Sequence, residues 1–124
     1  MAQANNSSKE KTRALAMTLA RAAEEFKAEE VRVLNVADLL YITDYFVIAT
    51  TQTPRQTRAM ADALNAASKE VGFHKGTVEG DWRSTWLLMD FGTVVVHILT
   101  AEAREFYDLD TLWEDAPEVE IQAA

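Results

Sequence analysis

The sequence predicts a single α/β domain, in which a mixed sheet of about five strands is flanked by helices. Three observations predict it: a continuous apolar run at Tyr45–Thr50, a capped helix directly after that run, and two β-rich stretches around Asp90-Phe91-Gly92. A chain of 124 residues with 48% hydrophobic positions is large enough to bury one core.

The first elements are a helix and two strands. Apolar residues recur at helical spacing between Lys9 and Lys27, which predicts an amphipathic helix. The stripe consists of Leu15, Leu19, Ala22 and Phe26. Val31–Val36 is rich in β-branched residues and is predicted to be a strand. Tyr45–Thr50 is predicted to be a central strand that is covered on both faces.

The boundary after the central strand carries a capping box. Thr53 is the predicted N-cap, Pro54 takes the first helical position, and Gln56 stands three residues after the cap. The helix is predicted to end at Gly72, a residue suited to the left-handed position beyond a helix end. Together with a β-prone stretch at Phe73–Val78, these elements predict one right-handed crossover.

The last elements are two strands and two short helical turns. Ser84–Asp90 and Thr93–Thr100 are predicted strands, joined by a hairpin turn in which Gly92 takes a positive φ. Thr100 is expected to cap a short helix, and a final turn carries Leu109, Leu112 and Trp113. We place the domain at residues 9–117, between a flexible N-terminus at 1–8 and a flexible acidic tail at 118–124.

Charge is concentrated at the C-terminal end. The net charge is −8, and residues 101–124 contain eight acids against one base. Nucleic-acid binders neutralise phosphates with Lys and Arg, so direct binding of RNA or DNA is disfavoured. The acidic segment favours a basic protein partner, although such a segment also serves solubility alone. The chain has no cysteine, which suits a reducing compartment, and it shows no secretory signal and no apolar run of membrane-spanning length, so we expect no membrane contact. The Asn-Asn-Ser-Ser opening leaves an organellar transit peptide as the less favoured alternative.

The residues offer little for catalysis or cofactor binding. No glycine opens a helix after a strand in the spacing of a phosphate loop. His97 lies inside a predicted strand and is interpreted as a hydrogen-bonded structural residue. Asp108 and Asp110 have the spacing of a magnesium-binding pair, but their place at a helix junction favours a capping role. We therefore predict no enzyme activity, no metal and no cofactor.

Large aromatic residues stand where the chain is predicted to turn. Trp86 lies near a strand start, Phe91 lies in the hairpin turn, and Trp113 lies on the acidic segment. Such residues are candidates for the anchors of a protein interface. A place in the core is the alternative, favoured for Trp113 and left open for Phe91.

Several short motifs, in unbroken order from about Leu15 to Pro117, resemble the Iojap-type ribosomal silencing factors. They are Ile42–Thr50 (ITDYFVIAT), Arg55-Gln56, Met60–Asp62 (MAD), Val78–Gly80 (VEG), Trp86–Gly92 (WLLMDFG), Val94–Ile98 (VVVHI), Arg104–Leu109 (REFYDL) and Leu112-Trp113. Each motif alone is weak, whereas their joint order and spacing are highly specific.

The resemblance implies a non-catalytic cytoplasmic protein with a fold akin to nucleotidyltransferases but without their catalytic pattern. Its implied partner is universal large-subunit protein fourteen of the ribosome, and its implied action is a steric block of subunit association when nutrients run short. It also implies a homodimer when free. The family's contact positions fall on Trp86 and Phe91, and Leu87 and Met89 are added because they share the alternation parity of Phe91.

The sequence departs from the family pattern at three positions: Thr51 replaces a glycine, Asn35 replaces an aspartate, and Thr93 replaces an acid. The first departure puts a turn with positive φ in doubt, and the last puts a charged contact with a basic partner in doubt. Two alternative functions stay open, a nucleotidyltransferase-like enzyme using Asp108 and Asp110 and an oligomeric scaffold.

Overall fold

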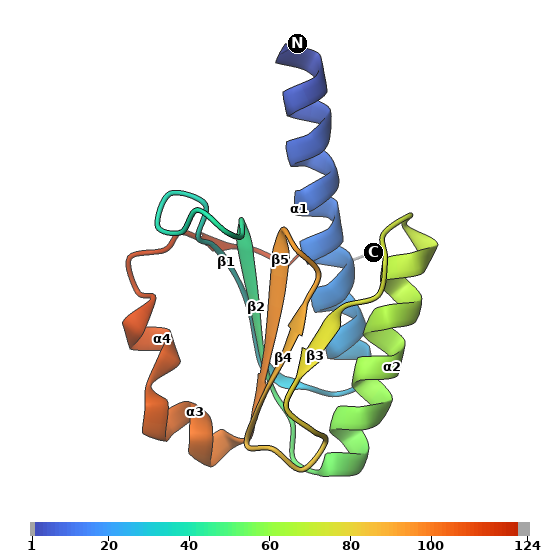
Figure 1. Ribbon diagram of the computed structural model, residues 1–124. Helices are drawn as coiled ribbons and strands as arrows, with labels where there is room; N and C mark the ends of the chain where they lie inside the picture. Colours follow the sequence, from blue (N-terminus) through green and yellow to red (C-terminus); the bar gives the residue numbers. More distant parts are fainter. Residues whose placement is uncertain (1, 122–124) are drawn as a thin grey trace.

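The computed structural model describes residues 2–121, with side chains from residue 8 onward, and forms one six-stranded mixed sheet with helices on both faces (Figure 1). The elements are α1 (Ala2–Glu25), β1 (Glu29–Asn35), β2 (Tyr45–Thr50), α2 (Pro54–Glu70), β3 (Thr77–Glu79), β4 (Trp86–Asp90), β5 (Val94–Leu99), α3 (Ala101–Tyr107), α4 (Leu109–Leu112) and β6 (Glu118–Val119). The strand order is β3-β4-β5-β2-β1-β6. The predicted α/β class and mixed sheet are confirmed.

The sixth strand lies in the segment that was predicted to be a flexible tail. β6 pairs antiparallel with β1, and Val119 is buried opposite Val33. A strand of two residues carries no alternation that a sequence pattern could reveal. At the other end, α1 begins at Ala2 rather than near Lys9, since neither proline nor glycine interrupts those first residues. Met1 and residues 122–124 lie outside the described residues.

The helices cover the two faces unequally. α1 and α2 lie along one face and α3 and α4 lie against the other, where they leave the β3–β4 end uncovered (Figure 1). All six residues of β2 are buried, which confirms a central strand covered on both faces. β2 runs parallel to β5, whereas β4 runs antiparallel to β5 and to β3. The β2–α2–β3 connection therefore joins two parallel strands, with β5 and β4 between them.

The predicted helix boundaries are confirmed by their capping bonds. The Thr53 hydroxyl accepts a hydrogen bond from the Gln56 amide at 3.0 Å, and Gly72 follows the helix with φ +86°. The Thr100 hydroxyl likewise accepts from the Ala103 amide at 3.1 Å. These caps fix the two helices that follow the parallel strands, one on each face of the sheet.

Two of the family departures are accommodated locally. Thr51 is buried, its hydroxyl shares a 2.7 Å hydrogen bond with that of Thr57, and it is not among the residues with positive φ. The Asn35 side chain accepts a hydrogen bond from the Ala37 amide at 3.1 Å, as an aspartate would. Neither position needs the family residue for its backbone conformation.

Candidate interaction surface on the open sheet face

The alternation of β4 places the predicted site residues on opposite faces of the sheet. Leu87 and Met89 are fully buried and Phe91 is only 2% exposed, all on the face that α1 and α2 cover. Trp86 is partly buried on the other face, among residues that pack with α3 and α4. The expected outward display of Phe91, and of the two residues that share its parity, is therefore wrong.

Phe91 points inward because a glycine makes room for it. A Cβ atom added at Gly76 would lie 2.8 Å from Phe91 Cζ and 3.0 Å from both Cε atoms, so the ring fits directly over this glycine. The turn is closed by a 2.9 Å bond from the Phe91 amide to the Val94 carbonyl, and the Asp90 carboxylate accepts from the Gly92 amide at 2.7 Å. Gly92 has φ +91°, which confirms the predicted hairpin turn.

The uncovered face carries an aromatic surface that β4 and β5 share with α3. We call it the aromatic face, and its members are Trp86, Leu88, Val95, Phe106 and Tyr107. The Trp86 ring centroid lies 5.0 Å from that of Tyr107, and Tyr107 stands edge-on to Phe106, also at 5.0 Å. Phe106 is 80% exposed and Tyr107 is 50% exposed, whereas the β-strand members are partly buried. Exposed apolar surface of this kind is a candidate interaction site.

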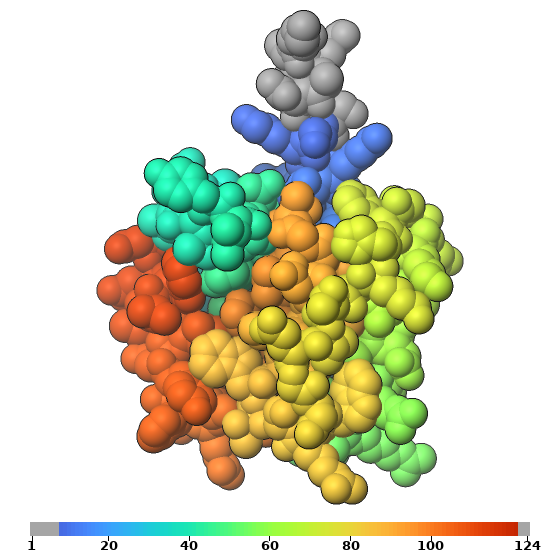
Figure 2. All heavy atoms as spheres, viewed as in Figure 1, coloured from blue at the N-terminus to red at the C-terminus, as the bar shows by residue number. Residues whose placement is uncertain are grey.

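Further exposed apolar side chains lie outside the aromatic face. They are Leu39, Tyr41 and Ile42 in the β1–β2 connection and Leu112 in α4. In Figure 2 the β1–β2 connection, β4 and the α3–α4 segment all reach the same visible side of the molecule. Sequence reasoning missed these residues, because a connection and a helix end do not show which side chains stay uncovered.

His97 supports the aromatic face from beneath. Its Nδ1 accepts a hydrogen bond of 3.2 Å from Trp86 Nε1, and its ring stands edge-on to Phe46. Because an indole N–H can only donate, His97 must be neutral with its proton on Nε2. Burial lowers the pKa of His97 to about 4. The predicted role as a hydrogen-bonded structural residue is confirmed.

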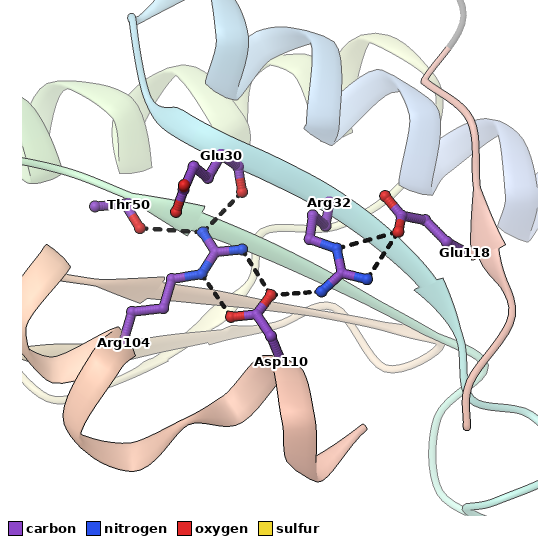
Figure 3. Close-up of polar contacts among 6 residues, drawn as sticks. All are labelled: Glu30, Arg32, Thr50, Arg104, Asp110 and Glu118. Carbon is purple, nitrogen blue, oxygen red and sulfur yellow. Dashed lines mark hydrogen bonds and ion pairs between the residues drawn. The ribbon is translucent and has the colours of Figure 1, made fainter. Parts of the chain in front are cut away.

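Asp110 is held by two arginines instead of capping a helix. Its carboxylate accepts bonds of 2.9 Å from Arg104 Nε and Nη2 and of 2.6 Å from Arg32 Nη1, and Arg32 also contacts Glu118 (Figure 3). The hydrogen bonds from Arg104, followed by those from Arg32, lower the pKa of Asp110 to about 2. Asp108 takes a left-handed conformation between α3 and α4, and its side chain makes no capping bond. The predicted capping bond is therefore wrong, although Asp108 holds the N-cap position of α4 and Asp110 lies in its first turn.

The same hydrogen bonds disfavour magnesium binding by Asp108 and Asp110. Both oxygens of Asp110 already accept charge-assisted hydrogen bonds, and Arg104 is itself 6% exposed and donates further to the Glu30 carbonyl and the Thr50 hydroxyl. A metal ion would have to displace two guanidinium groups. Within residues 2–121, no three His, Asp or Glu side chains are arranged to hold a metal ion.

The acids that remain unengaged by this network give the α3–α4 side a negative surface. They are Glu102, Glu105, Asp108, Glu114, Asp115 and Glu120, and all are exposed. This surface borders the aromatic face through α3, which carries Phe106 and Tyr107. No helix in the described part of the chain is long and apolar enough to cross a membrane.

These features define a small α/β domain with an apolar, acid-bordered sheet face as its candidate site. The chain matches the family model described as "Ribosomal silencing factor during starvation" over residues 9–124, and it belongs to this family. It is 37% identical to "Ribosomal silencing factor RsfS" of Halalkalibacterium halodurans, covering 82% of this chain and 86% of that protein. It is 38% identical to "Protein Iojap, chloroplastic" of Zea mays over 86% of this chain, but spans only 46% of that protein.

Solved structures agree with the assignment of the fold. A crystal structure from Bacillus halodurans has a TM-score of 0.73 at 32% identity, covering 87% of this chain and 98% of that one. A protein from Chromobacterium violaceum has a TM-score of 0.76 at 26% identity, covering 90% of this chain and 92% of that one.

Proposed function

We propose that this chain binds the large ribosomal subunit through universal large-subunit protein fourteen and blocks association with the small subunit, so that translation is repressed under nutrient limitation. The observation that carries the proposal is the aromatic face around Trp86, which α3 contacts but leaves partly exposed and which an acidic surface borders. Family membership supports the ribosome as the target. The action is occupancy, which requires no turnover, metal or cofactor, and it takes place in the cytoplasm.

The chemistry of the surface fits a basic protein partner. Aromatic side chains supply most of the binding energy of an interface once they are desolvated. The exposed acids of α3 and α4 would form a negative rim around that centre, which speeds encounter with a basic protein and rejects acidic ones. An interface of ordinary size buries about 800 Å² on each partner.

The four residues expected from the family pattern have different roles in this proposal. Trp86 contacts the partner directly, together with Leu88, which shares its parity and faces the uncovered side. Leu87, Met89 and Phe91 would have to leave the core to make such a contact. We propose that they instead position β4 from beneath, so that Trp86 is presented at a fixed height and angle.

Binding to purified large subunits tests the proposal. Trp86→Ala should lower the affinity by about 30-fold, since an interface anchor contributes about 2 kcal/mol or more. Phe26→Ala serves as a matched control, because Phe26 is an exposed aromatic residue beyond the end of α1, away from the aromatic face. Co-sedimentation and inhibition of subunit joining give the two readouts. A folded Trp86→Ala protein with unchanged affinity and inhibition would refute the assignment of the site.

The free chain is proposed to be a homodimer, a state that a plain scaffold would share, so binding to large subunits is what distinguishes the two. A scaffold that uses its aromatic residues only for self-association would stay at the top of a gradient containing large subunits. A silencing factor would sediment with them. The nucleotidyltransferase alternative gains no support from Asp110, whose carboxylate is neutralised by Arg32 and Arg104.

A further inference from the structure

A second surface of distinct chemistry lies at the same end of the sheet, on the side of α2. A hollow of about 500 Å³ is lined by Pro54, Arg55, Arg58, Asp81, Trp82 and Arg83. The first three come from the start of α2, and the other three come from the connection between β3 and β4. All three arginines are exposed, whereas Trp82 is partly buried and packs against the core beneath it. Three guanidinium groups therefore surround one anchored indole.

The positive charge of this hollow is not neutralised by neighbouring acids. Within the described residues, Arg55, Arg58 and Arg83 take part in none of the salt bridges. Asp81 is the one acid that lines the hollow, and its carboxylate accepts a 2.7 Å hydrogen bond from the Arg83 backbone amide. Three arginines against one acid leave a net charge of +2 at this spot. On a chain with net charge −8, such a local excess is unexpected for a merely solvated surface.

The connection that carries the hollow is held in a defined shape. Gly80 has φ +100°, which favours glycine at this turn. The Asp81 amide donates to the Ser84 hydroxyl at 2.9 Å, and the Ser84 amide donates to the Asp81 carbonyl at 3.0 Å. Trp82 and Arg83 therefore project from a closed turn, which reduces the entropy lost when a ligand fixes them.

We propose that this hollow binds ribosomal RNA, with Arg55, Arg58 and Arg83 on backbone phosphates and Trp82 against a base or ribose. The proposal rests on the proposed function, because large-subunit RNA is the polyanion that a docked protein would meet. A planar guanidinium group pairs two donors with phosphate oxygens, and an indole gives a flat face for stacking that does not depend on base identity. An acidic peptide would be served by the arginines alone and gives no role to Trp82.

The placement suits simultaneous contacts with a protein and with RNA. Trp82 packs on the α1–α2 side of the sheet and Trp86 on the opposite side, although only three residues lie between them. The β3–β4 connection, which carries Trp82, and the start of β4, at Trp86, lie at the end of the sheet where α2 and α3 begin, which is the lower end of the view in Figure 1. In Figure 2 the segment around residue 82 stands beside α2, whereas the acidic α3–α4 segment lies on the far side of β4. The net negative charge of the chain is thus segregated from the arginines.

The decisive comparison uses two proteins that lose the same charge at different places. One carries Arg55→Gln, Arg58→Gln and Arg83→Gln, and the matched control carries Arg13→Gln, Lys69→Gln and Lys75→Gln, all at exposed positions. Binding to large subunits is measured between 50 and 200 mM salt. Each lost phosphate contact lowers the slope of log K against log salt by about 0.7 to 0.9, so this salt increase should weaken the arginine variant about 20- to 40-fold less than the unaltered chain. The control should keep the full slope.

A photo-reactive amino acid in place of Arg58 identifies what occupies the hollow. An adduct with large subunits that ribonuclease shortens supports RNA, and a ribonuclease-resistant adduct to a protein overturns the proposal. An arginine variant with unchanged affinity and salt slope also overturns it while leaving the proposed function standing. If the unaltered chain does not bind large subunits, both the proposed function and the proposed RNA contact are refuted. Binding to the isolated ribosomal protein should be weakened by Trp86→Ala, as for large subunits, and should be kept in the arginine variant.

Discussion

Replacing Gly76 with alanine tests whether Phe91 belongs to the core. The new Cβ would lie 2.8 to 3.0 Å from three ring atoms of Phe91, whereas ordinary contacts begin near 3.4 Å. Phe91 is 2% exposed, so its ring has little room to move away. Overpacking of a tight core costs about 1 to 3 kcal/mol, and the lower entropy of the unfolded alanine chain returns about 0.4 to 1 kcal/mol. We expect a net loss of about 1 to 2 kcal/mol in the free energy of unfolding.

Urea unfolding of single and double variants measures this contact directly. Phe91→Leu should be destabilising by itself, but Gly76→Ala should cost less in the Phe91→Leu background, because the smaller side chain leaves space for the methyl group. A coupling free energy of at least about 0.5 kcal/mol is expected for residues in contact. A neutral or stabilising Gly76→Ala, or strict additivity of the two changes, would show that the ring does not rest on this glycine.

Two further predictions concern buried polar groups. The pKa of His97 is near 6.5 in the unfolded chain and near 4 in the folded protein. The free energy of unfolding should therefore fall by about 3 kcal/mol as the pH drops from 6.5 to 4, and should then level off. His97→Phe should flatten this dependence, which urea unfolding at a series of pH values measures. Asp110→Asn should cost about 1 to 3 kcal/mol because Arg104 is left buried with a weaker partner, whereas Glu118→Gln should cost under about 1 kcal/mol. The stabilisation from Asp110 is present above pH 3.8 and should be lost as the pH falls towards 2. Equal losses of stability in Asp110→Asn and Glu118→Gln would contradict the predicted difference.

The candidate site shows where sequence reasoning stopped. Strict alternation in β4 correctly indicated that Leu87, Met89 and Phe91 share one face. It could not indicate that this face is the covered one, because α1 and α2 pack there while α3 and α4 cover only part of the other side. The turn position of Phe91 left its direction open and the family resemblance placed it at the interface, yet Gly76 on a neighbouring segment opens a space that the Phe91 ring fills.

The sequence did not reveal the hollow lined by Arg55, Arg58 and Arg83, for a related reason. Net charge is a sum over the chain, and a value of −8 disfavoured contact with RNA. Arg55 and Arg83 are separated by many residues and become neighbours only because α2 starts beside the β3–β4 connection. Charge acts through distance and dielectric, so a local group of cations can bind phosphate on a protein that is acidic as a whole.

The sequence by itself determined the local structure and the family. The apolar run of β2, the Thr53 and Thr100 caps, and the turn at Gly92 depend on interactions within a few residues, and the order of the motifs indicated the silencing factors. Tertiary structure alone decided which faces are covered, how β6 joins β1 through two residues, and where Arg32, Arg104 and Asp110 meet. Those outcomes depend on residues brought together from distant parts of the chain, for which no local pattern exists.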